Sequence, residues 1–337
     1  MKIAVDGMGG DHNIPHINIE GANLALQEDK NLEVVLVGPE KLLLENIDKT
    51  IHLKDVRKRI KVVNADEIVY MDEQPSKVLR SKQNSSIGVG IHLLKNDIVD
   101  AFVSAGNSGA VVAFSLTQIG TVKNVDRPAI AAVLPTISTR CVILDVGANV
   151  DCKPQHLVEF ALMGKIYCEK LLNLNNPKVA LLSIGTEEGK GNTQSLLAYQ
   201  LLLEQKSLNF IGNIEGKDIP FGVADVVVVD GFVGNIVLKF GEGIAEVLLK
   251  LIKQSLKKHP FAWFALPFVW NAIRDLRKKV DFTEYGGAPL LGLEKVCIIS
   301  HGRSNAKAIK NAILTAKQMV EKRVNYIISE SMKRIYE

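Results

Sequence analysis

Six short glycine-containing loops hold the residues whose types are best suited to binding a ligand or to catalysis. They are DGMGGD (6–11), SAGNSG (104–109), DVGAN (145–149), SIGTEEGKGN (183–192), DGFVGN (230–235) and SHGRSN (300–305). Glycine lets a ligand approach the backbone closely, serine and asparagine add short hydrogen-bonding groups, and helix N-termini attract negative charge. One such loop is equally typical of a structural turn, whereas six of them at the ends of strands favour a shared oxyanion ligand, above all phosphate.

Candidate phosphate ligands come from these loops. We predict that phosphate is bound by Asp6, Gly9, Gly10, Ser104, Gly106, Asn107, Ser108, Gly147, Asn149 and Arg303. Cationic partners are few, and Lys82 and Arg127 are weaker candidates than Lys190. Lys190 lies between two glycines, which suits a side chain that must reach into a crowded site. Arg303 has a second interpretation of equal weight, because it stands where it could anchor the last helix.

Several familiar sites are excluded by their spacing rules. The chain has no GxxxxGK[ST] segment of a P-loop and no GxGxxG segment of a dinucleotide site, and no serine lies in a GxSxG segment. The four cysteines form no CxxC pair and no metal-ligand spacing, so they read as buried thiols. We therefore expect no metal, no organic cofactor and no covalent acyl-enzyme.

The elements that must position the loops alternate along the chain. Candidate buried strands cover 2–5, 33–37, 60–63, 101–104, 129–134, 141–145, 179–183, 209–211, 226–229 and 296–299. Helical periodicity follows many of them, for example over 154–170 and 306–329. Continuous apolar strands that alternate with helices predict a three-layer α/β/α fold with a mainly parallel, Rossmann-like sheet. No linker divides residues 1–337, so we predict a single catalytic domain.

The overall composition is typical of a globular protein. Of the 337 residues, 47% are hydrophobic and 23% are charged, which is enough apolar material for a large core. The N-terminus enters an apolar strand pattern at once, without a leader-like segment. The longest uncharged apolar run, 260–270, is short for a membrane span and carries two prolines. These features predict a cytoplasmic protein, and they leave peripheral membrane contact open.

The segment 241–282 departs from the alternation of strands and helices, and it contains the excess of basic residues. Residues 250–281 contain eight lysines or arginines against two aspartates, although the whole chain has a net charge of only +4. Both tryptophans lie in the aromatic stretch between two helical patterns, so we predict a protruding helical hairpin with an aromatic tip.

The contact residues of this hairpin are predicted to be Lys257, Lys258, Phe261, Trp263, Phe264, Phe268, Trp270, Arg274, Arg277 and Lys278. Aromatic rings between cations suit an anionic membrane surface or an acidic carrier protein, and a homodimer interface is the alternative. Nucleic-acid binding is not expected, because the remainder of the chain is slightly acidic.

Seven segments together resemble one known family. AVDGMGGDH, SAGNSGA, DRPAIAAVLPT, LDVGANVD, GTEEGKGN, DVVVVDGFVGN and YGGAPLLGL follow one another over nearly the whole chain. In this order they resemble the signature segments of the bacterial phosphate acyltransferases of phospholipid synthesis, the PlsX family. Two departures are conservative: Gly7 stands where the family often has alanine, and Ser108 where threonine is common.

The resemblance implies transfer of a long-chain acyl group from acyl carrier protein to inorganic phosphate. It also implies a homodimer, a fold like that of isopropylmalate dehydrogenases and phosphotransacetylases, and a catalytic pair that maps to Lys190 and Asn235. The downstream glycerol-phosphate acyltransferase is a further expected partner. Two alternatives stay open: a phosphotransacetylase-like enzyme that uses a short acyl-CoA, and a non-catalytic membrane scaffold of lipid synthesis.

Overall fold

Short apolar runs form one twisted sheet in the computed structural model of this protein, which describes residues 1–12, 14–137, 140–258, 274 and 286–336. The strands are β1 (Lys2–Asp6), β2 (Glu33–Gly38), β3 (Ile60–Asn64), β4 (Ala101–Ser104), β5 (Ala129–Pro135), β6 (Arg140–Leu144), β7 (Lys178–Leu182), β8 (Asn209–Ile214), β9 (Val226–Val228), β10 (Ala288–Leu291) and β11 (Val296–Ile299). Their order across the sheet is β3-β2-β1-β4-β11-β10-β5-β6-β9-β7-β8. Seven neighbouring pairs are parallel and three, all involving β5 or β10, are antiparallel. The prediction of a mainly parallel sheet is confirmed.

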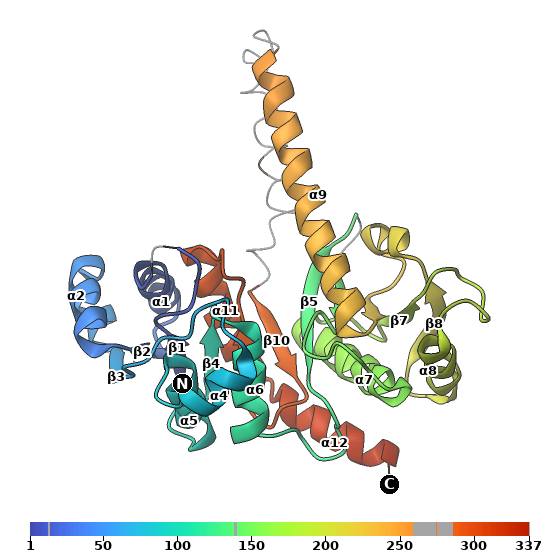
Figure 1. Ribbon diagram of the computed structural model, residues 1–337, viewed down its shortest axis with the longest axis horizontal. Coiled ribbons are helices and arrows are strands. Elements are labelled where there is room, and N and C mark those ends of the chain that lie inside the picture. Colours follow the sequence, from blue (N-terminus) through green and yellow to red (C-terminus); the bar gives the residue numbers. More distant parts are fainter. Residues whose placement is uncertain (13, 138–139, 259–273, 275–285, 337) are drawn as a thin grey trace.

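Helices cover both faces of this sheet (Figure 1). They are α1 (His16–Glu28), α2 (Glu40–Thr50), α3 (Lys54–Lys58), α4 (Pro75–Ser81), α5 (Ser86–Lys95), α6 (Ser108–Gln118), α7 (Pro154–Leu171), α8 (Thr193–Glu204), the 3-10 helix η1 (Gly216–Phe221), α9 (Gly231–Lys258), α11 (Ala306–Glu321) and α12 (Val324–Tyr336). Several begin where the sequence provides an N-terminal cap. Asn107, Asn192 and Asn305, for instance, each accept a hydrogen bond from a backbone N–H in the first turn of α6, α8 and α11.

Side-chain alternation along the strands divides the core into two halves. Ile3 and Val5 of β1 join the cluster formed with α1, α7 and α11, while Ala4 between them joins the cluster formed with α5 and α6. The same alternation places Phe102 of β4 opposite its neighbours Ala101 and Val103. Because successive residues of a strand point to opposite faces, two buried faces mean a sheet covered on both sides. The predicted three-layer α/β/α fold is therefore confirmed.

The antiparallel strands β5 and β10 join two groups of parallel strands. One group is β3, β2, β1, β4 and β11, and the other is β6, β9, β7 and β8. The three antiparallel pairings give the two groups opposite directions along the sheet. The residues that follow β4 and β11 nevertheless line one cavity together with residues that follow β6 and β9. The sheet in this way brings loops from distant parts of the chain to one site.

Helix α9 projects away from the sheet, as Figure 1 shows. Its predicted apolar face is exposed, and the five large side chains on it are Ile244, Val247, Leu248, Leu251 and Ile252. The predicted hairpin is thus described along its first arm as far as Lys258, and Arg274 is exposed. The side chain of Lys257 and the predicted residues Phe261, Trp263, Phe264, Phe268, Trp270, Arg277 and Lys278 lie outside what the structure describes. The single-domain assignment stays a prediction.

The C-terminal region differs from its predicted pattern. The periodicity over 306–329 predicts one helix, whereas α11 ends at Glu321 and α12 begins at Val324. Arg323 between them has a left-handed backbone with φ of 52°, which ends regular α-helix. Both helices still bury apolar residues in one cluster, so the pattern of burial survives the break.

Candidate active site

A cavity of about 400 Å³ lies between the two groups of strands. Its polar lining comes from loops at the carboxyl ends of strands and from α9: Ser108 follows β4, His301 follows β11, Gly147 follows β6, and Asn235 follows β9. Its apolar wall includes Ile130, Ala132, Val133, Leu134, Val146 and Leu238. One enclosure therefore combines a polar end, suited to an anion, with a wall suited to hydrocarbon.

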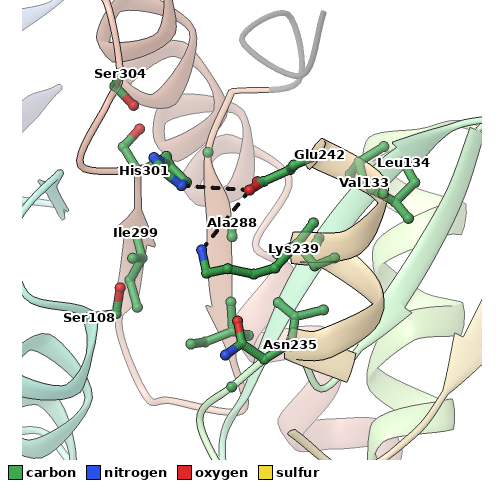
Figure 2. A pocket seen from close by; sticks show the side chains of 18 of the residues that line it. Ser108, Val133, Leu134, Asn235, Lys239, Glu242, Ala288, Ile299, His301 and Ser304 are labelled. Carbon is green, nitrogen blue, oxygen red and sulfur yellow. Dashed lines mark ion pairs between the residues drawn. The ribbon is translucent and has the colours of Figure 1, made fainter. Parts of the chain in front are cut away.

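Helix α9 carries three polar side chains into this cavity. Asn235, Lys239 and Glu242 stand at the i, i+4 and i+7 positions, so they share one face of the helix. The Glu242 carboxylate lies 4.0 Å from the Lys239 ammonium and 3.7 Å from His301 Nε2 (Figure 2). Burial lowers the pKa of His301, and the Glu242 carboxylate opposes that shift only in part. We infer that the imidazole is largely uncharged at neutral pH.

The Asp145 carboxylate organises the loop beneath Asn235. It is fully buried and accepts hydrogen bonds from the backbone N–H groups of Ile130, Gly147, Ala148 and Asn149. Burial raises the pKa of Asp145, and these donors work against the rise. Gly147 has a φ of +136°, and a Cβ built on it would lie 3.7 Å from that of Asn235. The loop is thereby held directly against the start of α9.

A second buried aspartate organises the loop after β1. Asp6 accepts hydrogen bonds from Ser104 Oγ at 2.7 Å and from the backbone of Met8, and burial raises the pKa of this carboxyl. A Cβ on Gly9 would lie 2.5 Å from the backbone nitrogen of Gly106, so the close approach of the two loops requires glycine at position 9. The structure gives these predicted phosphate ligands contacts within the protein. Their binding role stays a prediction.

The two asparagines that were predicted to bind phosphate, Asn107 and Asn149, also make hydrogen bonds within the fold. Asn107 caps α6 and donates from its amide to the carbonyls of Tyr70, Met71 and Glu73. Asn149 donates to the carbonyl of Pro128 at 2.7 Å and to Asp145. Both side chains are at least nine-tenths buried. These two side-chain amides are therefore engaged within the protein.

The remaining predicted residues are divided between the cavity and its surroundings. Ser108, Gly147 and Asn235 line it. Lys190 is exposed on the loop after β7, and its strand is the direct neighbour of β9, which leads to Asn235. Arg303 is exposed and pairs with Glu246 at 3.4 Å. Gly10 has a φ of +134° and lies near the backbone of Gly302.

Sequence reasoning missed three ionisable residues that line the cavity, namely Lys239, Glu242 and His301. His301 belongs to one of the six loops but was not selected. Lys239 and Glu242 lie inside a helix, whereas the predicted ligands were all taken from loops. Helical periodicity counted forward from Asn235 would have found both.

Glu159 of α7 supports the loop that leads into β5. Its carboxylate is almost fully buried and accepts the backbone N–H of Asp126 at 3.0 Å, next to the Pro128 carbonyl that binds Asn149. Burial raises the pKa of Glu159 from 4.5 to about 7; the hydrogen bond from the Asp126 backbone works against the rise, and the negative charge of the Asp126 side chain adds to it. Folding therefore favours the protonated form. The resulting stabilisation is complete below pH 4.5 and is lost as the pH rises through about 7.

We expect Glu159→Gln to remove this pH dependence. At pH 8 the neutral amide should raise the free energy of unfolding by roughly 1–3 kcal/mol relative to the wild type, and at pH 4.5 the two proteins should be similar. Urea unfolding at both pH values measures the difference. Glu169→Gln, on the same helix but paired with Lys165 at 2.7 Å, is the control and should show no such gain. A variant less stable than the wild type at pH 8 would contradict the assignment.

The described part of the chain lacks two features that other functions would need. It contains no group of three or more histidine, cysteine, aspartate or glutamate side chains placed to hold a metal ion. Nor does it contain a helix that is long and apolar enough to cross a bilayer.

Solved structures first place the fold in a class. A phosphotransacetylase from Streptococcus pyogenes superposes with a TM-score of 0.63 at 21% identity, over 95% of this chain and 94% of that one. A phosphotransacetylase from Staphylococcus aureus gives a TM-score of 0.60 at 18% identity, with the same coverage. At these identities the likeness establishes the shared fold, and it confirms the predicted resemblance to phosphotransacetylases.

Sequence relatives then define the family. The family model described as fatty acid synthesis protein matches residues 1–327. A phosphate acyltransferase of Endomicrobium trichonymphae is 47% identical over 335 residues, covering 99% of this chain and 98% of that protein. A phosphate acyltransferase of Thermodesulfovibrio yellowstonii is 50% identical over 337 residues, covering 100% and 96%. The chain belongs to the fatty acid synthesis protein family and is an enzyme of the phosphate acyltransferase type.

Proposed function

We propose that this enzyme transfers a long-chain fatty acyl group from acyl carrier protein to inorganic phosphate in the cavity between the two groups of strands. The observation that carries the proposal is the pairing of a polar end, with Ser108, Asn235 and Lys239, and an apolar wall within one cavity. A thioester carbonyl must meet phosphate at such a boundary, because one reactant is an anion and the other carries a hydrocarbon chain.

The reaction requires no covalent enzyme intermediate. An oxygen of phosphate attacks the thioester carbonyl carbon, the carbonyl oxygen takes up negative charge, and the carbon–sulfur bond then breaks. The carrier-protein thiolate leaves and is protonated by water, so acyl phosphate and free carrier protein are the products. Phosphate is a weak nucleophile, and most of the acceleration should come from holding it in line with the carbonyl.

Asn235 and Lys190 are the residues we assign to this step. Asn235 lines the cavity beside Gly147, and its amide can donate to the oxygen that becomes negative. Lys190 stands on the loop of the neighbouring strand, which supports a role in offsetting the same charge. Backbone amides of residues 107–109, at the start of α6, would complete the binding of phosphate. The amides of Gly106 and of residues 147–149, which were also predicted for this role, donate to Ser104 and Asp145 within the protein.

A comparison of donors tests the proposed substrate. Palmitoyl–acyl carrier protein, palmitoyl-CoA and acetyl-CoA are each incubated with enzyme and phosphate, and acyl phosphate is trapped with hydroxylamine. The apolar wall leads us to expect the most hydroxamate from the carrier-protein donor. Product from acetyl-CoA alone would move the enzyme to the phosphotransacetylases, and no product from any donor would favour the scaffold.

The exposed apolar face of α9 supports a peripheral site of action. Exposed apolar side chains seek a partner, and the basic aromatic sequence that follows suits an anionic membrane surface. Such docking would deliver the labile product where a downstream glycerol-phosphate acyltransferase consumes it. The same face is also suited to a homodimer contact or to the acidic carrier protein.

We expect Trp263→Ser/Trp270→Ser to abolish flotation of the enzyme with phosphatidylglycerol vesicles. Aromatic rings bind at the depth of the lipid headgroups, and serine removes that contribution. Phe221→Ser is the control, because Phe221 is an exposed aromatic residue on η1, outside the hairpin, and should not affect flotation. Unchanged flotation of the double variant would remove the membrane assignment and leave the dimer or carrier-protein contact.

A further inference from the structure

One positively charged side chain, that of Lys239, lines the cavity, and no sequence motif indicates it. Lys239 is the single lysine or arginine among the described residues that line the cavity. Two other cations considered for phosphate have partners elsewhere. Arg303 pairs with Glu246 at 3.4 Å, while Lys82 pairs with Glu73 at 2.8 Å and donates to the Ile68 carbonyl. Lys190, on the loop after β7, does not line the cavity either, so Lys239 is the lysine that a phosphate bound there would meet directly among the described residues.

The position of Lys239 relative to Asn235 fits such a role. The two residues are one helical turn apart on the same face of α9, so they reach adjacent parts of the cavity. Figure 2 shows the Lys239 side chain extending from α9 toward the end of β11, where Ile299 and His301 lie. Loops after β4 and β11 close that side with Ser108 and Ser304. An anion there would be enclosed by short hydroxyl donors and one ammonium group.

Glu242 explains how the ammonium is kept in place before phosphate arrives. Its carboxylate is only 15% exposed and lies between Lys239 and His301, at 4.0 and 3.7 Å. An ammonium facing a carboxylate at this range stays near it, but the contact is long enough for a stronger anion to compete. Because burial keeps the nearby imidazole largely uncharged, His301 adds a polar contact and little charge.

We propose that Lys239 binds the inorganic phosphate substrate, with Glu242 as the positioning residue that holds its ammonium toward the cavity. The proposal rests on the proposed function for the identity of the anion. It adds a phosphate-binding residue to the pair Lys190 and Asn235. It also assigns separate roles to two residues at the polar end of the cavity. Lys239 holds the phosphate nucleophile, and Asn235 faces the thioester carbonyl that the phosphate attacks.

Steady-state kinetics with varied phosphate test the assignment. We expect Lys239→Met to raise the KM for phosphate about tenfold or more while the KM for the acyl donor stays within about twofold, because a charge-assisted contact to one substrate is lost. Lys239→Arg keeps the charge and should recover most of the affinity. Lys250→Met is the matched control, since Lys250 pairs with Glu246 at 3.7 Å on the same helix but does not line the cavity.

A binding measurement separates this inference from the proposed reaction. Inorganic phosphate at constant ionic strength should raise the melting temperature of the wild type and of Lys250→Met, and it should have little effect on Lys239→Met. Equal stabilisation of Lys239→Met and the wild type, or an unchanged KM for phosphate, would overturn the role of Lys239. A wild type that is stabilised by phosphate through Lys239 but forms no acyl phosphate would instead overturn the proposed function alone.

Discussion

Asn235→Ala is expected to lower kcat for acyl phosphate formation by about 100- to 1000-fold, the usual effect of removing one donor to a developing oxyanion. Asn235 begins the row of polar residues that α9 directs into the cavity, and it lies against Gly147 of the loop that Asp145 organises. Its side chain is exposed to the cavity, so truncation should leave the fold intact. The loss should therefore appear in kcat, with the melting temperature nearly unchanged.

Gln254→Ala is the matched control for this variant. Gln254 is an exposed amide on the same helix, outside the residues that line the cavity, and its truncation should leave kcat unchanged. Initial rates for the two variants with palmitoyl–acyl carrier protein, followed as hydroxamate, make the comparison. An Asn235→Ala enzyme with kcat within about twofold of the wild type would remove Asn235 from the reaction, because a lost oxyanion donor costs far more.

Gly234→Ala should produce the largest loss of stability. A Cβ at this position would lie 1.8 Å from the carbonyl oxygen of Asp145 and 3.0 Å from the Val229 side chain, so the start of α9 or the Asp145 loop must move. Overpacking of this kind costs about 3 kcal/mol or more when backbone is the obstacle. Because the same loop supports Gly147 and Asn235, activity should fall together with stability.

Gly243→Ala separates this effect from the helix propensity of alanine. Gly243 lies on the same helix, and a Cβ there would meet nothing within 4 Å. We expect this control to be neutral or stabilising by up to about 1 kcal/mol. Urea unfolding of both variants provides the measurement. If Gly234→Ala were as stable as Gly243→Ala, the contact between α9 and the Asp145 loop would not exist in solution.

The strands were the most predictable part of the fold, because apolar runs in a sheet buried on both faces need no alternation to be recognised. Predicted and observed boundaries agree within a few residues for ten strands. The missed strand, β10, is short, follows Gly286 and Gly287, and contains Pro289, all features that argue against a strand. It is nevertheless one of the two strands that connect the groups, so the reversal of strand direction and the shared cavity were out of reach of sequence reasoning.

The site was predictable in its loops and less so in its side chains. Four of the six glycine-containing loops contribute residues to the cavity, whereas no residue of the loops 6–11 and 183–192 lines it. Sequence alone could not show that Asn107 and Asn149 use their amides within the fold, since the backbone carbonyls that accept from them lie far away along the chain. Conversely, Lys239 and Glu242 are polar residues of an exposed helix, where solvated charges are the ordinary expectation, and only the packing of α9 over the cavity distinguishes them.

Dependence of thioester cleavage on phosphate is the most direct test of the central claim. The enzyme is incubated with palmitoyl–acyl carrier protein and hydroxylamine, with and without inorganic phosphate, and both hydroxamate and free carrier protein are measured. Because hydroxylamine also cleaves thioesters directly, the amounts formed in a blank without enzyme are subtracted. Direct attack by bound phosphate then predicts that both products form together and only when phosphate is present. Release of carrier protein at the same rate without phosphate would contradict direct transfer and would point to hydrolysis or to an acyl-enzyme.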